Sequence, residues 1–284
     1  MVNVNYSLVG SNGDTITFDD SNYILNPGMA GFGIPATEVR IAPSASDGGI
    51  WRYTKRGIRD IDLPITVLGT DRADVQAKLR RLARLTQDKK GPTQLRANYD
   101  GGESLFLELH YTAGAESQWG ESAGMIWSTW LMSFQAPMPF WESNTEQTFS
   151  VTSANRGRGL LPQLSKLKVT NSENLGTVVV ESDADVNVFP TWIIEGPITN
   201  LVISSGSQSF GFNTPIDSGE TITVDTELGT VTNQDGDNLY AILNPAPKLF
   251  PFEPGTTTIE VDGVDVSTET FIRCTYALRF EVVH

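Results

Sequence analysis

Few residues in this sequence could take part in chemistry, and each stands apart from the partners that catalysis needs. The chain has two histidines, His110 and His284, and one cysteine, Cys274. His110 lies in an alternating segment typical of a strand, so we interpret it as a partly buried or surface residue. Cys274 falls on the apolar side of another such segment, where a small core residue is expected. A single cysteine also excludes an intramolecular disulfide and a cysteine-based zinc cluster.

Two acidic clusters raise the question of a metal site or a glycosidase. Residues 233–238 gather oxygen ligands around Gly236, as calcium loops do, but the glutamate that closes an EF-hand loop is missing. We therefore predict a hairpin turn there. Glu181, Asp183 and Asp185 alternate with small residues, and we expect a solvated loop, although paired carboxylates could hydrolyse a glycoside.

The usual catalytic templates are absent from the sequence. It contains no Gly-x-Ser-x-Gly elbow, Walker loop, dinucleotide fingerprint or His-Glu-x-x-His helix. We therefore predict no catalytic residue, no cofactor and no metal site. Exposed tryptophans could instead stack on sugars or anchor protein contacts, although we expect most of them in the core. The tryptophans are Trp51, Trp119, Trp127, Trp130, Trp141 and Trp192.

The formal charge of −14 is unevenly distributed. Residues 1–96 hold 13 Lys and Arg against 10 Asp and Glu, whereas residues 97–284 hold 7 against 24. A nucleic-acid-binding domain should be basic overall, and the acidic remainder of this chain would repel phosphates. The distribution suits a surface that DNA passes without being bound.

Length and composition favour a mainly β chain with one large or two ordinary domains. It has 284 residues, with 26 glycines and 15 prolines that predict turns at short intervals. No charged-then-apolar leader opens the sequence, and no apolar run is long enough to span a membrane. We expect a soluble protein that is synthesised in a cytoplasm.

The elements that organise the chain lie in residues 51–87, where a strand precedes a long helix. The strand has one buried face, and Pro64 places it at a sheet edge or points the missing N–H outward. Thr70 or Asp71 can cap the helix, whose remaining surface is basic. The apolar residues of strand and helix are Ile61, Leu63, Ile65 and Val67, then Val75, Leu79, Leu82 and Leu85.

The rest of the chain reads as short strands in two domains. Prolines and aromatics at 137–141 end the first, and we predict domains at 1–143 and 150–284, the second a β-sandwich. Residues 43–50 and 112–124 are expected as loops. The final strand, 271–283, could complete either domain.

The order of these motifs resembles a known family. The stretch Tyr53–Pro64 and the helix ending with Leu79–Leu85 are similar to the N-terminal belt domain of the distal tail proteins of phages with long, non-contractile tails (siphophages). Pro137–Trp141 resembles the exit from that domain. The segments Ile222–Val231 and Leu249–Gly255 resemble the family's C-terminal sandwich.

The resemblance implies both a fold and a role. The implied fold is mainly β: a β-sheet or split-barrel belt domain with one long α-helix, then a galectin-like β-sandwich. Family members form a homo-hexameric ring that joins the tail tube protein to the tail-tip or baseplate hub proteins and leaves a channel for DNA. The implied location is the virion tail tip, after synthesis in the bacterial host cytoplasm. Receptor-binding or carbohydrate-binding tail proteins are further implied partners; DNA only passes, and no membrane is involved.

We expect the basic side of the helix to make the subunit contact of this ring, through Arg80, Arg81 and Arg84. Pairing of strand edges between subunits is the alternative. Two other functions stay open from the residues. They are a carbohydrate-binding module of a phage or bacterial surface protein, and a virion glycosidase.

Overall fold

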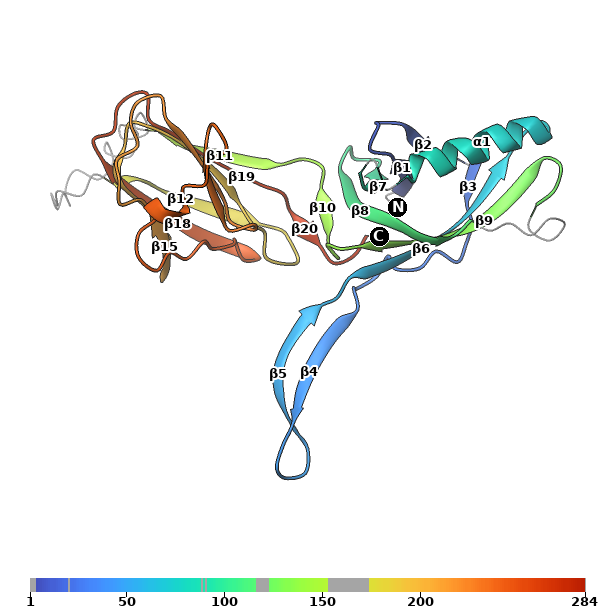
Figure 1. Cartoon of the computed structure of the whole chain (residues 1–284), viewed down its shortest axis with the longest axis horizontal. Helices are drawn as coiled ribbons and strands as arrows, with labels where there is room; N and C mark the ends of the chain where they lie inside the picture. The colour runs from blue at the N-terminus through green and yellow to red at the C-terminus, as the bar shows by residue number, and fades with distance from the viewer. Residues whose placement is uncertain are drawn as a thin grey trace. The chain divides into compact units, whose positions relative to one another are not determined.

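The computed structural model of the chain is mainly β and falls into two compact units (Figure 1). Unit 1 is formed by Met1–Thr145 and Phe280–His284, and unit 2 by Glu146–Arg279. Trp119 and His284 lie outside the residues that the structure describes. Those residues are 4–19, 21–87, 89, 91–115, 123–152 and 174–283.

Unit 1 is built on one large sheet that is nearly closed, like a barrel. Its strands follow the order β2-β1-β7-β8-β9-β6-β3, and β10 pairs with β8 and with β20. The α-helix of the described chain, α1 (Arg72–Leu85), belongs to this unit. The strands are β1 (Val4–Val9), β2 (Thr15–Thr17), β3 (Tyr23–Leu25), β6 (Arg59–Leu68), β7 (Thr93–Tyr99), β8 (Ser104–Gly114), β9 (Trp127–Ala136), β10 (Trp141–Ser143) and β20 (Arg279–Phe280).

The strand and helix predicted within 51–87 are both present. In α1, Val75, Leu82 and Leu85 are buried while most of the arginines face outward. Side chains three and four residues apart share one helix face, so this spacing gives the expected amphipathic helix. The buried residues of β6 are Ile61, Leu63, Ile65 and Val67.

Pro64 lies inside β6, which is flanked by β9 and β3 and is not an edge strand. Its carbonyl accepts a hydrogen bond from Asn26 N at 2.8 Å, just beyond Leu25, the last residue of β3. The N–H and C=O of one antiparallel residue point to the same side. The backbone nitrogen of Pro64, which has no hydrogen to donate, therefore faces the position beyond the end of β3, where no strand needs a donor. This is the outward orientation, one of the two predicted alternatives.

Residues 37–56 form an isolated two-stranded ribbon, which corrects the prediction of a loop at 43–50. β4 (Thr37–Pro43) pairs with β5 (Gly49–Arg56), so that only 44–48 turn. Figure 1 shows the ribbon projecting from the end of β6, and nearly all of its residues are exposed. The serines and glycines of the turn have the composition of a loop, which hid the strands on either side.

The last residues return to unit 1, although the predicted second domain runs to 284 and the prediction leaves the final strand open between the two domains. Phe280 packs against the core of unit 1, and Val283 is buried within it. The predicted final strand is therefore divided: β19 (Phe271–Tyr276) belongs to unit 2, and residues from Phe280 onward belong to unit 1. The predicted loop at 112–124 also begins later, because β8 runs to Gly114.

Unit 2 is a β-sandwich with sheets ordered β11-β19-β13-β16-β17 and β12-β18-β14-β15. Its core takes Trp192 and Val224 from the first sheet and Ile203 and Val261 from the second. Cys274 lies in the same core, where burial raises the pKa of its thiol. The remaining strands are β11 (Gln147–Thr152), β12 (Asn174–Ser182), β13 (Thr191–Glu195), β14 (Thr199–Ser205), β15 (Gln208–Gly211), β16 (Thr221–Asp225), β17 (Thr230–Asn233) and β18 (Gly255–Val264).

Candidate subunit-contact site

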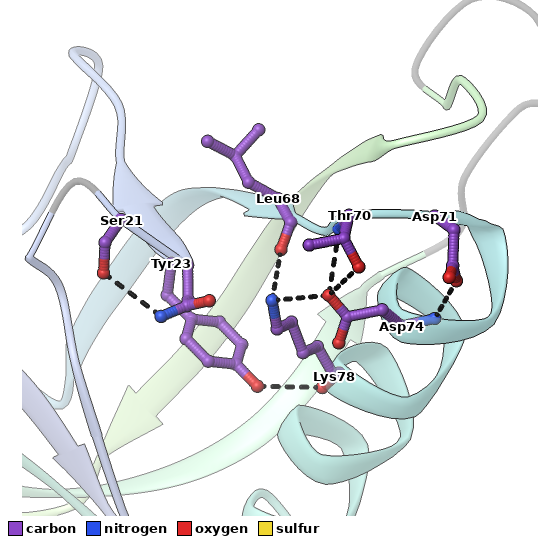
Figure 2. Close-up of polar contacts among 8 residues, drawn as sticks. Ser21, Tyr23, Leu68, Thr70, Asp71, Asp74 and Lys78 are labelled. Atoms are coloured by element: carbon purple, nitrogen blue, oxygen red, sulfur yellow. Dashed lines mark hydrogen bonds and ion pairs between the residues drawn. The ribbon is translucent and has the colours of Figure 1, made fainter.

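The helix that carries the predicted contact residues is fixed at its N-terminus by a polar cluster (Figure 2). Asp71 is the N-cap and accepts a hydrogen bond from Asp74 N at 2.9 Å. Asp74 accepts one from Thr70 N at 3.0 Å and pairs with Lys78 at 2.9 Å, which lowers the pKa of the Asp74 carboxyl. The cap satisfies helix N–H groups, and the carboxylate complements the helix dipole.

Lys78 also ties the helix to two strands of the sheet. Its Nζ donates to Leu68 O at the end of β6, at 2.9 Å. Tyr23 Oη, from β3, donates to Lys78 O at 3.2 Å. Figure 2 shows these groups converging from the helix and both strands. The position of the helix on the sheet is therefore fixed, and with it the direction of the basic side chains that follow.

The three predicted contact residues lie on the second half of α1, but they are not equally available. Arg80 and Arg84 are exposed. Arg81 forms a two-pronged ion pair with Asp14, with Nη2 2.6 Å from Oδ1 and Nε 3.1 Å from Oδ2. It also donates to Thr15 O at 2.8 Å. Arg81 therefore fastens the turn between β1 and β2 to the helix within one chain.

A polar hollow of about 440 Å³ lies beside this ion pair. Arg81 and Arg84 line it, and Arg80 does not. Within the described part of the chain Arg84 has no ion pair, whereas Lys78 and Arg81 each have one. The hollow can therefore offer the Arg84 guanidinium to a carboxylate from outside. Its lining residues are Thr15, Ile16, Thr17, Asp19, Asn22, Tyr23, Ala77, Lys78, Arg81 and Arg84.

Sequence reasoning missed Asp14 and Lys78 as members of this site. Asp14 lies in the connection between β1 and β2, and its partner Arg81 lies 67 residues further along, so no local pattern links the two. The sequence signal that could have revealed the Asp14–Arg81 pair was a carboxylate at a turn, in a chain whose predicted helix is basic. The subunit contact itself stays a prediction.

The other candidate residues serve local structure. Asn233 Oδ1 accepts hydrogen bonds from Asp235 N at 3.0 Å and Asp237 N at 2.8 Å, as in the predicted turn. Glu181 lies in β12 and not in the predicted loop, whereas Asp183 and Asp185 follow that strand, and all three side chains are exposed. Among the described residues, no group of three His, Cys, Asp or Glu could hold a metal ion.

Replacing Asp14 by Asn is expected to lower the free energy of unfolding of unit 1 by about 1 kcal/mol or less at pH 7, since exposed pairs contribute little. The hydrogen bond from Arg81 lowers the pKa of Asp14 below its ordinary 3.8. The stabilisation is therefore present above that pH and is lost as the pH falls through the folded-state pKa. Urea unfolding at successive pH values should show the two proteins converging in acid. A constant difference at every pH would contradict this assignment.

Comparison with known proteins shows which proteins resemble this chain in sequence and in architecture. Residues 11–106 match the family described as phage tail protein RIFT-related domain. The Dit (gp 19.1) protein of phage SPP1 is described as a paradigm of the hub adsorption apparatus in phages that infect Gram-positive bacteria. It is 12% identical, with a TM-score of 0.66, and the match covers 97% of this chain and 99% of that one.

A second match is a chain of the phage P2 baseplate in its activated conformation. It is 9% identical, with a TM-score of 0.54, over 99% of this chain and 100% of that one. A comparison with curated protein sequences gave no match. The predicted resemblance is confirmed: the chain has the fold of the SPP1 Dit protein, and residues 11–106 match a phage tail domain.

Proposed function

We propose that this chain is the distal tail hub of a phage with a long, non-contractile tail. In this proposal unit 1 of every copy takes part in a hexameric ring at the virion tail tip. The ring joins the tail tube to the tail-tip or baseplate proteins and leaves a channel for DNA. The match to the SPP1 hub protein over nearly the whole chain, both units included, is the observation that supports the proposal most.

The candidate chemical groups fit a structural role without catalysis. Cys274 is a core residue, and the carboxylates at 233–238 belong to a hydrogen-bonded turn. A carbohydrate-binding module would need exposed aromatic residues on the sandwich. The one tryptophan in the sequence of unit 2, Trp192, is fully buried and cannot stack on a sugar. In the described part of unit 2, the aromatic side chain that is exposed is Tyr240, at 45%. Among the described residues, no helix is long and apolar enough to cross a membrane.

Light scattering on the purified protein tests the ring. We expect a mass of about six times the 31.0 kDa chain mass. The double variant Arg80→Glu, Arg84→Glu should shift that mass toward a single chain, because it reverses two exposed charges and leaves the Arg81–Asp14 pair intact.

The control is Lys248→Glu, an exposed charge reversal in unit 2 that should keep the wild-type mass. Circular dichroism should be unchanged in both variants, since none of the altered side chains is buried. A ring that survives the double reversal would show that the helix side is only solvated. A wild-type protein that stays a single chain at tens of micromolar would count against the hub itself.

A further inference from the structure

The ribbon β4–β5 carries an apolar face that the described chain leaves uncovered. Residues paired across antiparallel strands point to the same face, and Ile41 pairs with Trp51 in this register. Val39 lies two residues before Ile41 and therefore shares the face. All three side chains are more than half exposed. Trp51 Nε1 donates to Thr54 Oγ1 at 2.9 Å, which fixes the indole in place.

The opposite face of the ribbon is mixed, since it holds Ile50, 51% exposed and opposite Ala42, among polar residues. It carries Arg40 opposite Tyr53, and Glu38 opposite Lys55 with an ion pair of 3.0 Å. An isolated two-stranded hairpin is marginally stable in water, and an exposed apolar cluster marks an interaction surface. The ribbon therefore needs a partner on its apolar face.

A further exposed apolar feature of unit 1 is the tight turn that leads into β9. Gly124 N donates to Trp127 O at 2.8 Å, and Met125 and Ile126 stand at the tip, 70% and 52% exposed. Tight turns favour Gly, Pro, Asn, Asp and Ser, so two large apolar side chains need another reason. The turn is held in place, because Gly69 N donates to Ile126 O at 2.9 Å.

These two features lie at opposite ends of the β6–β9 pair. Arg59 pairs with Ala136 at the end from which the ribbon leaves, and Leu68 pairs with Trp127 at the end next to the turn. The ten residues of β6 span about 30 Å, so one chain cannot bring its own ribbon onto its own turn. Contact between two different patches of identical copies is heterologous, and it builds a ring when the rotation closes.

Charge favours the same pairing. Residues 37–56 hold four Lys and Arg against two Asp and Glu, whereas the rest of unit 1 holds nine against fifteen. A basic ribbon therefore approaches an acidic body. We propose that the apolar face of the ribbon, Val39, Ile41 and Trp51, binds the Met125–Ile126 turn of the next copy of this chain. The inference rests on the proposed ring and names a second contact within it, beside that of Arg80 and Arg84.

Thiol cross-linking tests this contact. The variant Ile41→Cys, Ile126→Cys, treated with a short bis-maleimide, should give a ladder of covalent oligomers on a denaturing gel. Each chain would carry two engineered thiols, and each thiol would be linked to a different neighbouring chain. The native Cys274 is buried and its thiol pKa is raised, so the wild-type chain serves as a blank. Either single variant should give no ladder.

The matched control is Tyr53→Cys, Ile126→Cys, which places the thiol on the opposite face of the ribbon. We expect clearly less cross-linked product from it, because its ribbon thiol points away from the docked turn. An equal yield from both pairs, or no ladder from the first, would overturn the proposal. A dimer from Ile41→Cys alone would also overturn it, because that product requires a symmetric contact.

Light scattering of Trp51→Ser separates this inference from the hub function. Loss of the indole should weaken assembly about tenfold or more, while Tyr53→Ser should have little effect. If Trp51→Ser forms rings as readily as the wild type, the ribbon contact fails and the hub proposal stands. If the wild type forms no ring and the cysteine pair gives no ladder, both fail.

Discussion

Replacing Arg59 by Met should lower the free energy of unfolding of unit 1 by about 3 kcal/mol, because it leaves one buried and three partly buried carbonyl groups without their donor. The Arg59 side chain is only 2% exposed. Its guanidinium donates to Pro139 O at 2.6 Å, Gly31 O at 2.6 Å, Gly33 O at 2.7 Å and Glu281 O at 2.7 Å. Burial lowers its pKa to about 10, so it stays charged at pH 7. One side chain therefore joins three distant segments of unit 1.

Urea unfolding followed by tryptophan fluorescence can measure this effect, because Trp141 is buried in unit 1 and Trp192 in unit 2. Only the transition of unit 1 should move. Arg59→Lys keeps the charge but cannot reproduce the guanidinium fork, so we expect an intermediate loss. Arg80→Met, an exposed position, should change the free energy by about 0.5 kcal/mol or less. A loss below about 1 kcal/mol for Arg59→Met would refute this role.

Replacing Trp192 by Ala should lower the free energy of unfolding of unit 2 by about 3–5 kcal/mol, since it opens a cavity in the core. The indole is fully buried. Its ring centroid lies 5.7 Å from Phe149, 6.2 Å from Phe210 and 6.3 Å from Phe252, in edge-to-face contacts. These rings lose their common partner when the indole is removed.

Trp192→Ala leaves unit 2 without a tryptophan, so circular dichroism during the urea titration should follow unit 2, while the fluorescence of Trp141 follows unit 1. Trp192→Phe fills much of the space and should lose clearly less stability than the alanine variant. Unit 1 has its own core, so its transition should keep its wild-type midpoint. A variant in which only the unit 1 transition moved would contradict the assignment of Trp192 to the centre of unit 2.

Local sequence patterns predicted the elements in which side-chain period and capping agree. The alternation in β6 and the helical spacing in α1 both follow from one buried face, and Asp71 caps the helix as one of two candidates. The position of Pro64 could be reduced to two alternatives only, because the choice depends on where a distant short strand ends.

The ribbon and the return of the chain end could not be predicted in the same way. Strands β4 and β5 bury little in the described chain, so their pattern lacks the contrast between a buried and a solvated face. The return depends on partners far away in sequence. Glu281 receives Arg56 through its carboxylate and Arg59 through its carbonyl, more than two hundred residues apart. The spacing of apolar residues within a segment carries no information about such a distant contact.

The candidate site was predicted in its residue types and only partly in its arrangement. Arg80 and Arg84 are exposed, as a contact surface requires. Arg81 is paired with Asp14, which a view of the helix alone could not show. The apolar face around Trp51 was also out of reach, because it appears only when the register of the ribbon is known.

Negative-stain electron microscopy of the purified protein, alone and mixed with tail tubes of the same virion, tests the hub proposal most directly. We expect annular, hexameric particles, either free in solution or seated on one end of a tube. Single chains in both samples, or particles bound along the tube wall instead of its end, would contradict it.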